Sequence, residues 1–349
     1  MTTKPLLDVR ELRVTFQIRR EGDMPWTKPR RLHAVGGVDF TLSPGETLGI
    51  VGESGSGKST LARALIGLAP GEGRAIWQDG TDLIGLSRRA MQPYRSDIQM
   101  VFQDPLASLN PRMTVGQIIA EPLSTHHPGL SRDEVKARVK EMMERVGLLS
   151  NQINRYPHEF SGGQCQRIGI ARALIVGPKL VICDEPVSAL DVSIQAQVIN
   201  LLADLQRDLN LALIFIAHDL SVVKHISDRV LVMYLGRVME IAEAEALYAA
   251  PQHPYTQALL SAVPVPDPGL ERSKTIIPLA GELPSPMAPP SGCVFRTRCP
   301  RARAECAAEV PPLFGGANHQ TACLFPGPLS EDEITRAISL EAADQPVPA

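Results

Sequence analysis

Hydrophobic and polar positions along the first two-thirds of the chain predict strands and helices in alternation. Short apolar runs bounded by turn residues predict strands over residues 9–16, 38–42, 47–51, 98–102, 180–183, 213–217 and 230–234. Segments with apolar residues every three or four positions predict helices over residues 59–66, 132–146, 164–175 and 194–209. This order of elements predicts an α/β fold.

Two of the strand runs also indicate where they lie in the sheet. Residues 180–183 and 214–217 are continuously apolar, as strands covered on both faces are. Between residues 102 and 180 the pattern is mostly helical, which predicts a helical subdomain over about 104–178 within a domain spanning 1–260. After residue 263 closely spaced prolines exclude long regular elements. We therefore expect a wrapped segment over 261–330 and a flexible tail over 331–349.

A glycine-rich segment directly after the 47–51 run is typical of a phosphate-binding loop. It reads Gly-Glu-Ser-Gly-Ser-Gly-Lys-Ser-Thr and precedes a helical pattern. The glycines let backbone N–H groups turn toward phosphate oxygens at the start of the helix, the lysine neutralises phosphate charge, and the serine hydroxyl binds Mg²⁺. The candidate nucleotide-binding residues of this loop are Gly52, Ser54, Gly55, Gly57, Lys58, Ser59 and Thr60.

Two carboxylates at the end of the 180–183 run supply complementary chemistry. Side chains at the carboxyl end of such a strand emerge into a ligand crevice. Asp184 there would hold Mg²⁺, and Glu185 would polarise the attacking water as general base. Together with an upstream phosphate loop, the pair predicts a nucleotide-hydrolysing site.

Charge and apolar content restrict the partners of the protein. The 35 basic and 38 acidic side chains leave a formal charge of -3, so there is no bulk electrostatic reason to bind nucleic acid. The N-terminus lacks the apolar core of an export signal, and no apolar stretch approaches the roughly 20 residues of a membrane-spanning helix. We expect a cytoplasmic protein that reaches a membrane only by docking to another protein.

Four of the six cysteines crowd into one C-terminal stretch: Cys293, Cys299, Cys306 and Cys323. In a reducing compartment such crowding indicates metal rather than disulfides. The spacings C-x5-C, C-x6-C and C-x16-C lack the C-x2-C pairs of most zinc ribbons. Four thiolates suit either zinc or an iron–sulfur cluster, and free thiols remain a third alternative.

Further motifs in a fixed order make residues 6–240 resemble the ATP-binding subunits of ABC transporters. The segment at 161–164 is similar to the signature motif of that family, with Phe160 where leucine is more usual. The segment at 188–191 resembles its D-loop, and aromatic stacking on adenine is implied near the end of the first strand. The residues carried by these resemblances are Phe16, Gln103 of the Q-loop, Ser161, Gly162, Gly163, Gln164, Asp191 and the switch histidine His218.

The resemblance implies a P-loop NTPase core in which two subunits pair head to tail. ATP would be held between the phosphate loop of one subunit and the signature motif of the other. Gln103 would join Ser59 and Asp184 around Mg²⁺, and would act with Glu185 and His218 in hydrolysis. Because both Glu185 and His218 are competent side chains, the resemblance implies an active ATPase.

Four segments, 104–116, 252–260, 279–286 and 292–300, resemble the ATPases of oligopeptide/dipeptide importers in particular. This implies an ATPase on the cytoplasmic face of the membrane that powers peptide uptake with two permease subunits, a second ATPase subunit and an extracytoplasmic peptide-binding protein. The 17–33 extension resembles the second of two paired ATPases, implying a heterodimer with a paralogue. Similarity of the C-terminal region favours a [4Fe-4S] cluster at the four cysteines, pinning the proline-rich tail.

Two other functions remain open from the sequence. A soluble ABC ATPase acting on ribosomes or DNA would be expected to carry tandem nucleotide domains, basic surfaces or long coiled coils, and this chain has one motif set and no heptad run. An importer of nickel chelates or sugars could use a similar ATPase. The sequence does not identify the cargo, because ATPase subunits do not line the translocation path.

Overall fold

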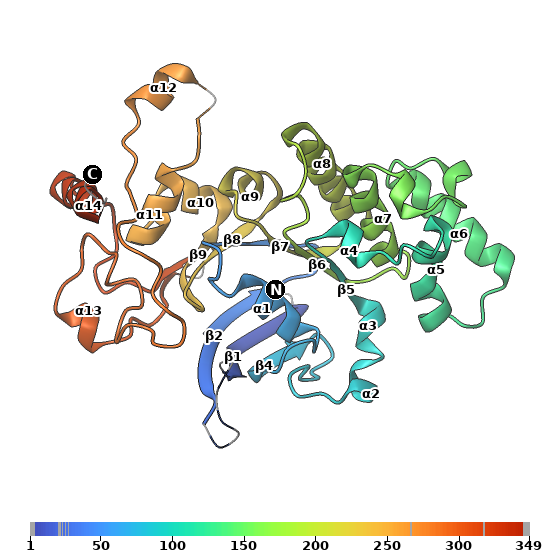
Figure 1. Ribbon diagram of the computed structural model, residues 1–349, viewed down its shortest axis with the longest axis horizontal. Helices are drawn as coiled ribbons and strands as arrows, with labels where there is room; N and C mark the ends of the chain where they lie inside the picture. Colours follow the sequence, from blue (N-terminus) through green and yellow to red (C-terminus); the bar gives the residue numbers. More distant parts are fainter. Residues whose placement is uncertain are drawn as a thin grey trace.

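The computed structural model describes residues 4–19, 22, 24, 26, 28–265, 267–316 and 318–344. Within these residues the chain forms two sheets, and helices line one side of the larger one (Figure 1). Parts of the predicted 17–33 extension and residues 345–349 of the predicted tail lie outside the described residues.

The larger sheet has eight strands among the described residues, in the order β10-β11-β9-β8-β3-β7-β6-β5. Its centre is parallel, with β3 between β7 and β8, and β6 between β7 and β5. The strands β9, β11 and β10 extend the β8 edge in antiparallel pairs. The bounds are β3 (Thr47–Val51), β5 (Ile98–Val101), β6 (Leu180–Asp184), β7 (Ala212–Ile216), β8 (Arg229–Tyr234), β9 (Arg237–Glu243), β10 (Phe314–Gly316) and β11 (His319–Thr321).

The smaller sheet is antiparallel and covers one face of the larger sheet. Its central strand β1 (Leu7–Ile18) pairs with β2 (Arg30–Leu42) and with β4 (Glu72–Trp77). The predicted strand over 9–16 lies within β1, and the predicted strand over 38–42 is the C-terminal end of β2, which pairing with β1 extends back through polar sequence to Arg30.

Helices form where apolar residues recur every three or four positions in the sequence. In chain order they are α1 (Lys58–Leu65), α2 (Arg88–Met91), α3 (Tyr94–Asp97), α4 (Pro105–Ser108), α5 (Val115–His126), α6 (Arg132–Arg145), α7 (Gly162–Leu174), α8 (Val192–Leu209), α9 (Leu220–Ile226), α10 (Ala244–Ala249), α11 (Pro254–Ser261), α12 (Pro268–Ser273), α13 (Glu305–Ala308) and α14 (Glu331–Asp344).

A helical lobe made of α4 to α7 stands at the right of Figure 1. Three of its helices begin with a reciprocal capping box. In this motif the side chain of the N-cap residue accepts from the backbone N–H of the third helical residue, and the side chain of that third residue accepts from the backbone N–H of the N-cap. The N-cap residues are Thr114 for α5, Ser131 for α6 and Ser161 for α7. Apolar side chains of the three helices share one core with the neighbouring face of the large sheet.

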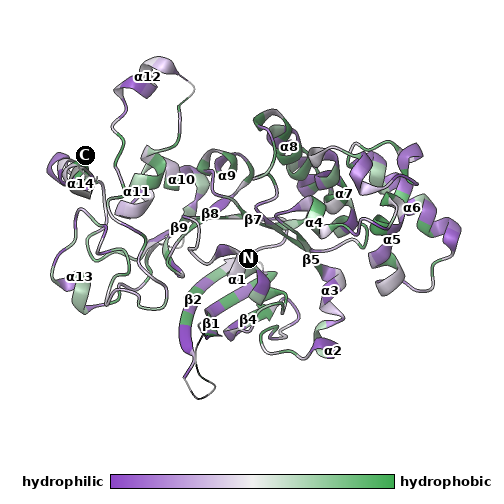
Figure 2. Cartoon of the chain, in the orientation of Figure 1, coloured by the Kyte–Doolittle hydropathy of each residue, from purple (hydrophilic) through white to green (hydrophobic). Residues whose placement is uncertain are grey.

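The central strands are apolar throughout because both of their faces are covered. In β7, Leu213 and Phe215 pack with the helices, whereas Ile214 and Ile216 pack toward the smaller sheet and α1. All four side chains are fully buried. Successive side chains of a strand point to opposite faces, so a strand buried on both faces has no polar positions to alternate. Figure 2 shows the hydrophobic strands at the centre of the molecule.

The proline-rich segment wraps around the β9 edge of the sheet, at the left of Figure 1. Residues 331–344, which the sequence predicted as part of a flexible tail, form the helix α14. Arg301 anchors this helix, since its Nε and Nη2 donate to the two carboxylate oxygens of Glu333 at 2.8 Å each. Ala337 of the same helix is buried. Arg301 is 32 positions from Glu333, so the local sequence pattern did not reveal that this helix docks.

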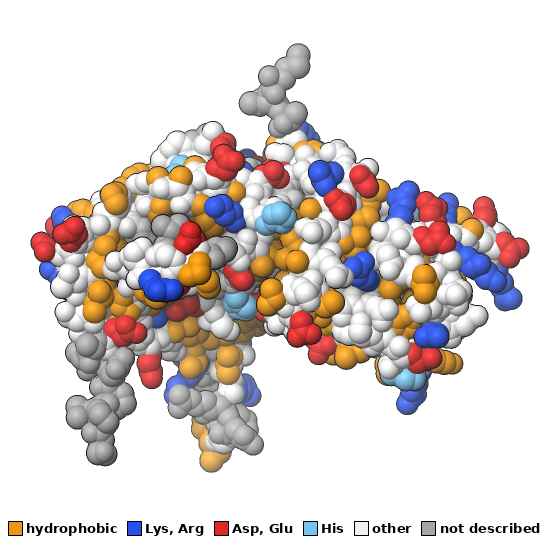
Figure 3. Space-filling view, turned by 90° about the horizontal axis from the view of Figure 1, so that it is seen from above, with side chains coloured by type: hydrophobic (Ala, Val, Ile, Leu, Met, Phe, Trp, Pro, Cys, Tyr) orange, Lys and Arg blue, Asp and Glu red, His pale blue; other side chains and the backbone are white. Residues whose placement is uncertain are grey.

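The surface carries both signs of charge. In the space-filling view, basic and acidic side chains are intermixed, most densely over the helical lobe at the right (Figure 3). None of the helices in the described parts of the chain has the length and apolar composition needed to cross a lipid bilayer.

Candidate active site

The candidate active site lies at the carboxyl edge of the parallel strands. The phosphate loop follows β3, Gln103 follows β5, Glu185 follows β6 and His218 follows β7. Because these four strands are parallel neighbours, the segments that leave them emerge at one edge of the sheet. Residues as far apart in the sequence as Gly52 and His218 thereby meet at one site.

The phosphate loop has a backbone that only glycine allows at two positions. Gly52 has φ of 148° and Gly57 has φ of 101°, both in the left-handed half of the map. A Cβ on Gly52 would lie 2.1 Å from the Met233 carbonyl oxygen, and one on Gly57 would lie 2.3 Å from the Ala34 carbonyl oxygen. The glycines therefore allow both the curl of the loop and its close packing against neighbouring backbone.

Lys58 is folded back over the loop. Its Nζ donates to the carbonyl oxygens of Gly52 and Glu53 at 2.8 and 3.0 Å, and the residue is only 4% exposed. Burial lowers the pKa of this amine, while the nearby carboxylates of Glu185 and Asp184 oppose that shift. The amine thus sits at the centre of the loop, where a phosphate oxygen could replace carbonyl oxygens as its partner.

Ser59 and Asp184 form the pair expected to hold Mg²⁺. The Ser59 hydroxyl donates to Asp184 Oδ1 at 2.6 Å, and Asp184 is 1% exposed at the end of β6. A hydroxyl and a carboxylate oxygen at this separation are hard oxygen donors of the kind Mg²⁺ prefers. Gln103 was also expected at the metal, but its Nε2 donates to Glu185 Oε2 at 2.7 Å. The structure therefore places the Gln103 amide nitrogen on the general-base candidate.

Glu185 is bonded on both carboxylate oxygens. Its Oε1 lies 2.5 Å from His218 Nε2, and its Oε2 accepts from Gln103. Its backbone has φ of 49°, an unusual value for a residue with a side chain, and its N–H donates to the Ile216 carbonyl at 3.0 Å. Strained backbone of this kind concentrates at functional sites, where the surrounding structure holds it.

A cavity of 390 Å³ opens in front of these groups. Most of the predicted nucleotide-binding residues line it, and three further lining residues, Leu32, Ala34 and Pro286, were not predicted from the sequence. The full lining is Phe16, Leu32, Ala34, Ser54, Gly55, Gly57, Lys58, Ser59, Thr60, Gln103, Glu185, His218 and Pro286. Phe16 and Leu32 are register partners in β1 and β2, so the apolar end of the cavity is built by the hairpin.

The signature and D-loop residues lie elsewhere on the chain. Ser161 caps α7 through its hydroxyl, and Ser161 and Gly162 are exposed. Gly163 is buried, and a Cβ there would come within 2.5 Å of Ile194 Cγ2 on α8. Asp191 is at the N-cap position of α8 and exposed. The structure gathers the signature and D-loop at the start of two packed helices, whereas the 390 Å³ cavity is lined by other residues.

The four C-terminal cysteines are free thiols that influence one another. Burial, above all, and to a smaller extent the neighbouring cysteines raise the pKa of Cys299 to about 12 and that of Cys323 to about 11. The described residues contain no group of three or more His, Cys, Asp or Glu side chains that could hold a metal ion as they stand. Cys293, Cys299, Cys306 and Cys323, which the sequence predicted as metal ligands, therefore do not form such a group in the described part of the chain.

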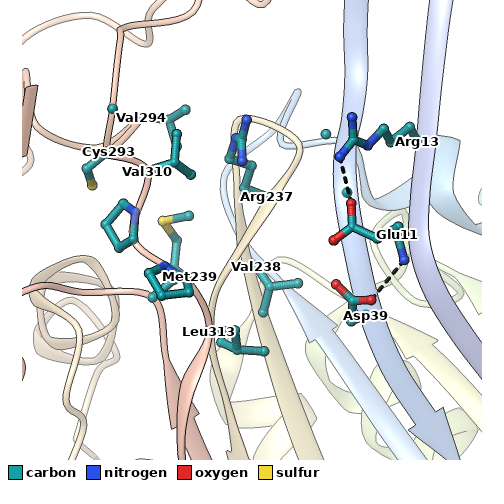
Figure 4. A pocket seen from close by; sticks show the side chains of 16 residues that line it. Glu11, Arg13, Asp39, Arg237, Val238, Met239, Cys293, Val294, Val310 and Leu313 are labelled. Atoms are coloured by element: carbon teal, nitrogen blue, oxygen red, sulfur yellow. Dashed lines mark hydrogen bonds and ion pairs between the residues drawn. The ribbon is translucent and has the colours of Figure 1, made fainter. Parts of the chain in front are cut away.

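A second cavity, of 190 Å³, reaches this cysteine-rich segment from the side of the smaller sheet. Figure 4 shows Glu11, Arg13 and Asp39 on the β1–β2 side of it and Cys293 on the opposite side, with Arg237 between them. Glu11 accepts from Arg13 at 2.6 Å. The cavity therefore separates the two regions and leaves Cys293 at its wall.

The fold and this site define a P-loop ATPase. Comparison with known proteins identifies the family to which it belongs. The ABC transporter family model matches residues 35–188, and the oligopeptide/dipeptide transporter C-terminal region model matches residues 239–306. The chain belongs to the ABC transporter ATP-binding proteins, within the oligopeptide transport group.

Individual relatives support this assignment over nearly the whole chain. The oligopeptide transport ATP-binding protein OppF of Salmonella typhimurium and that of Escherichia coli are each 64% identical over 327 residues, which is 93% of this chain and 98% of the relative. A solved dimeric ATP-binding cassette in a post-hydrolysis state, bound to ADP and Pi, is 27% identical with a TM-score of 0.60, and it covers 68% of this chain and 98% of its own. The relatives are named for oligopeptide transport, so the alternative of an ATPase acting on ribosomes or DNA has no support.

Proposed function

We propose that this chain is the ATPase subunit of a membrane importer and powers the uptake of di- and oligopeptides. The observation that carries the ATPase assignment is the convergence of the phosphate loop, Asp184 and the Gln103–Glu185–His218 chain at one sheet edge. The names of the relatives support peptides as the cargo.

Each residue of the site has a proposed role in hydrolysis. The glycine-rich loop and Lys58 bind the phosphates, and Phe16 stacks on the adenine. Mg²⁺, when bound, neutralises charge on the β- and γ-phosphates, and Ser59 and Asp184 would hold it. Glu185 accepts the proton of the attacking water, while His218 and Gln103 hold the Glu185 carboxylate in place through its two oxygens.

The test is transport by the assembled complex. A transporter reconstituted with this chain should take up peptide only with MgATP, and Lys58→Ala should abolish both ATP binding and uptake. Uptake of nickel chelates or sugars in place of peptides would assign the other cargo class. Continued ATP binding by the Lys58→Ala protein would show that the nucleotide site lies elsewhere.

We further propose that two ATPase subunits close head to tail on ATP, with this chain pairing with a paralogue. The exposed signature residues Ser161 and Gly162 lie on α7, apart from the cavity that holds the phosphate loop. A motif placed there can complete a nucleotide site only in another subunit. Two permease subunits and an extracytoplasmic peptide-binding protein would complete the importer, and this chain would lie on the cytoplasmic face of the membrane.

We propose a separate role for each part of the chain. Residues 1–260 form the ATP-binding domain, with a helical subdomain at about 104–178 that would face the permease. Residues 261–330 form the importer-specific region that carries the cysteines. Of the last part, residues 331–344 form α14 on this region.

For the four cysteines we propose a [4Fe-4S] cluster. Four free cysteine thiols in one segment form the donor set that such a cluster uses. A four-iron cluster gives each cysteine its own iron, so its ligands need not surround a single point as zinc ligands do. Anaerobically purified protein should contain iron and sulfide and absorb at about 400 nm, and Cys299→Ser should remove that absorption. Zinc without iron, or thiols that all react with an alkylating reagent, would identify the alternatives.

A further inference from the structure

Arg298 connects the cysteine-rich segment to the phosphate loop. Its Nη1 donates to Glu53 Oε2 at 2.6 Å and its Nη2 donates to Glu53 Oε1 at 3.2 Å, although the two residues are 245 positions apart. The Arg298 side chain is only 7% exposed. A two-point bond between a planar guanidinium and a carboxylate fixes orientation as well as distance. Glu53 is the second residue of the loop that carries Lys58.

The same guanidinium also holds a segment of the proline-rich region. Arg298 Nε donates to the Ala280 carbonyl and its Nη2 donates to the Leu279 carbonyl, both at 3.1 Å. We call residues 279–286 the strap. The guanidinium therefore bonds the phosphate loop on one side and the first residues of the strap on the other.

From that anchor the strap runs to the nucleotide cavity. A Cβ on Gly55 of the phosphate loop would lie 3.7 Å from Leu283 Cδ2, which is ordinary van der Waals contact. Pro286 lines the 390 Å³ cavity, and its carbonyl accepts from the His33 N–H at 3.3 Å. The strap thus lies beside the phosphate loop at Leu283 and forms part of the cavity wall at Pro286.

Aromatic residues around Arg298 make this junction rigid. The Tyr255 hydroxyl accepts from the Glu53 N–H at 2.9 Å, so Glu53 is held at its backbone and at its side chain. The rings of Tyr255 and Phe295 lie 5.3 Å apart, and Arg298 lies 5.9 Å from the centre of the Tyr234 ring. Burial, the largest single effect, would lower the pKa of Arg298, but Glu53 and Tyr234 together outweigh it and the pKa is raised. The guanidinium therefore remains charged and paired.

We propose that Arg298 is a positioning residue for nucleotide binding, which holds the phosphate loop and the strap together so that both walls of the cavity are in place before ATP arrives. The proposal rests on the nucleotide site proposed above. It assigns to the C-terminal region a direct part in the ATP affinity of the catalytic domain. Breaking the Arg298–Glu53 bond should loosen the loop and raise the KM for ATP, with a smaller effect on kcat.

The experiment measures KM and kcat for MgATP in the assembled transporter containing full-length variants. Arg298→Ala and Glu53→Ala should each raise the KM about two- to thirtyfold, the range expected when one coupling contact is lost. The double variant should be no worse than the stronger single variant, because both remove one interaction. Arg298→Lys should recover part of the affinity, since it keeps the charge but lacks the two-point geometry.

The matched control is Arg296→Ala, in the same segment, whose guanidinium bonds Ser291. It should leave the KM unchanged. If Arg298→Ala folds poorly, Glu53→Ala still tests the proposal. It removes the Arg298–Glu53 bond by changing the phosphate loop and leaves the sequence of the cysteine-rich segment intact. An unchanged KM in Glu53→Ala, or a fall in kcat at constant KM, would overturn the proposal.

Lys58→Ala separates this result from a failure of the nucleotide site itself. If Lys58→Ala abolishes ATP binding while Glu53→Ala has the wild-type KM, the proposed nucleotide site is correct and the proposed role of Arg298 is refuted. If Lys58→Ala still binds ATP normally, the proposed nucleotide site is wrong and Arg298 loses its role with it.

Discussion

At the scale of single residues, Glu185 is held in place by burial, by an unusual backbone conformation and by two polar neighbours. It is 6% exposed, has a positive φ, and accepts bonds from two polar side chains. A left-handed backbone at a residue with a side chain costs about 1–3 kcal/mol and persists only where neighbours enforce it. The strain directs the carboxylate into the cavity between Gln103 and His218.

The Glu185→Gln substitution should abolish hydrolysis while leaving ATP bound. The amide has nearly the same shape as the carboxylate but cannot accept the proton of the attacking water. The expected fall in kcat is about 10²- to 10⁴-fold. Single-turnover hydrolysis and ATP retention on a filter measure the two quantities separately, and wild-type turnover would exclude Glu185 as the base.

A second residue-scale prediction concerns Gly52. An alanine there has both a disfavoured φ and a Cβ 2.1 Å from the Met233 carbonyl oxygen, which is backbone and cannot move aside. We expect Gly52→Ala to lower the melting temperature and to remove ATP binding. Gly80→Ala is the control, since Gly80 also has a positive φ of 95° but a Cβ there meets nothing within 4 Å. The control should lose only about 1 kcal/mol from backbone strain; equal effects of the two substitutions would contradict the argument from close packing.

At the scale of elements, α11 begins with a buried histidine that stays neutral. His253 Nδ1 accepts from the Tyr255 backbone N–H at 3.1 Å, which caps the helix, and the His253 backbone N–H donates to Glu240 Oε2 at 3.0 Å. Burial, with a smaller contribution from Arg301, lowers the pKa of His253 from 6.5 to about 3. The unfolded chain therefore binds a proton below pH 6.5 that the folded chain rejects.

This difference predicts a loss of stability in mild acid. The stabilisation is complete above pH 6.5 and decreases as the pH falls from 6.5 toward 3. The slope contributed by one proton is at most about 1.4 kcal/mol per pH unit. His253→Asn keeps a capping oxygen without the titration, so its unfolding free energy should change less between pH 6.5 and 5 than that of the wild type. Parallel curves for the two proteins would rule out His253 as the cause.

The sequence predicted those elements whose pattern depends on burial of a whole face. The runs at 180–183 and 213–217 were recognised because both faces of the corresponding strands are covered. In β4, only Ala75 and Trp77 are buried, and the strand is defined by pairing with β1 rather than by its own pattern. The three-residue strands β10 and β11 depend likewise on the β9 edge. Such elements form because a distant partner strand is present, which no local window can reveal.

At the scale of the whole molecule, the signature residues and the phosphate loop belong to different regions of the surface. Ser161 caps α7, and Ser131 caps α6 with the same reciprocal geometry. The two serines therefore have the same local role. Only Ser161 belongs to the segment proposed to contact ATP bound in the partner.

Ser161→Asp tests that difference. Aspartate caps a helix as well as serine does, so folding and ATP binding by this chain should be retained. Its negative charge would face the phosphates of ATP in the partner subunit, so ATP-driven pairing and hydrolysis by the complex should fall at least about tenfold. Ser131→Asp is the matched control and should have wild-type hydrolysis. Chromatography with MgATP and a turnover assay give the two readouts, and normal pairing by Ser161→Asp would contradict closure across the subunit boundary.

The sequence by itself determined the α/β class, the phosphate loop and the strand-end position of Asp184 and Glu185. These features follow from periodicity and from residues adjacent in the chain, such as Lys58 and Ser59 at the start of α1. Periodicity reports which face of an element is buried, and a loop motif holds its own geometry because its glycines set the local backbone.

Only the tertiary structure decided that Pro286 lines the nucleotide cavity and that Arg298 forms an ion pair with Glu53. Nothing near residue 298 distinguishes that arginine from Arg296 or Arg301, and their different partners become apparent only when the proline-rich segment is wrapped around the sheet. A contact across 245 positions is decided by the path of the intervening chain, because its free energy depends on how all the elements pack together and is not encoded at either end.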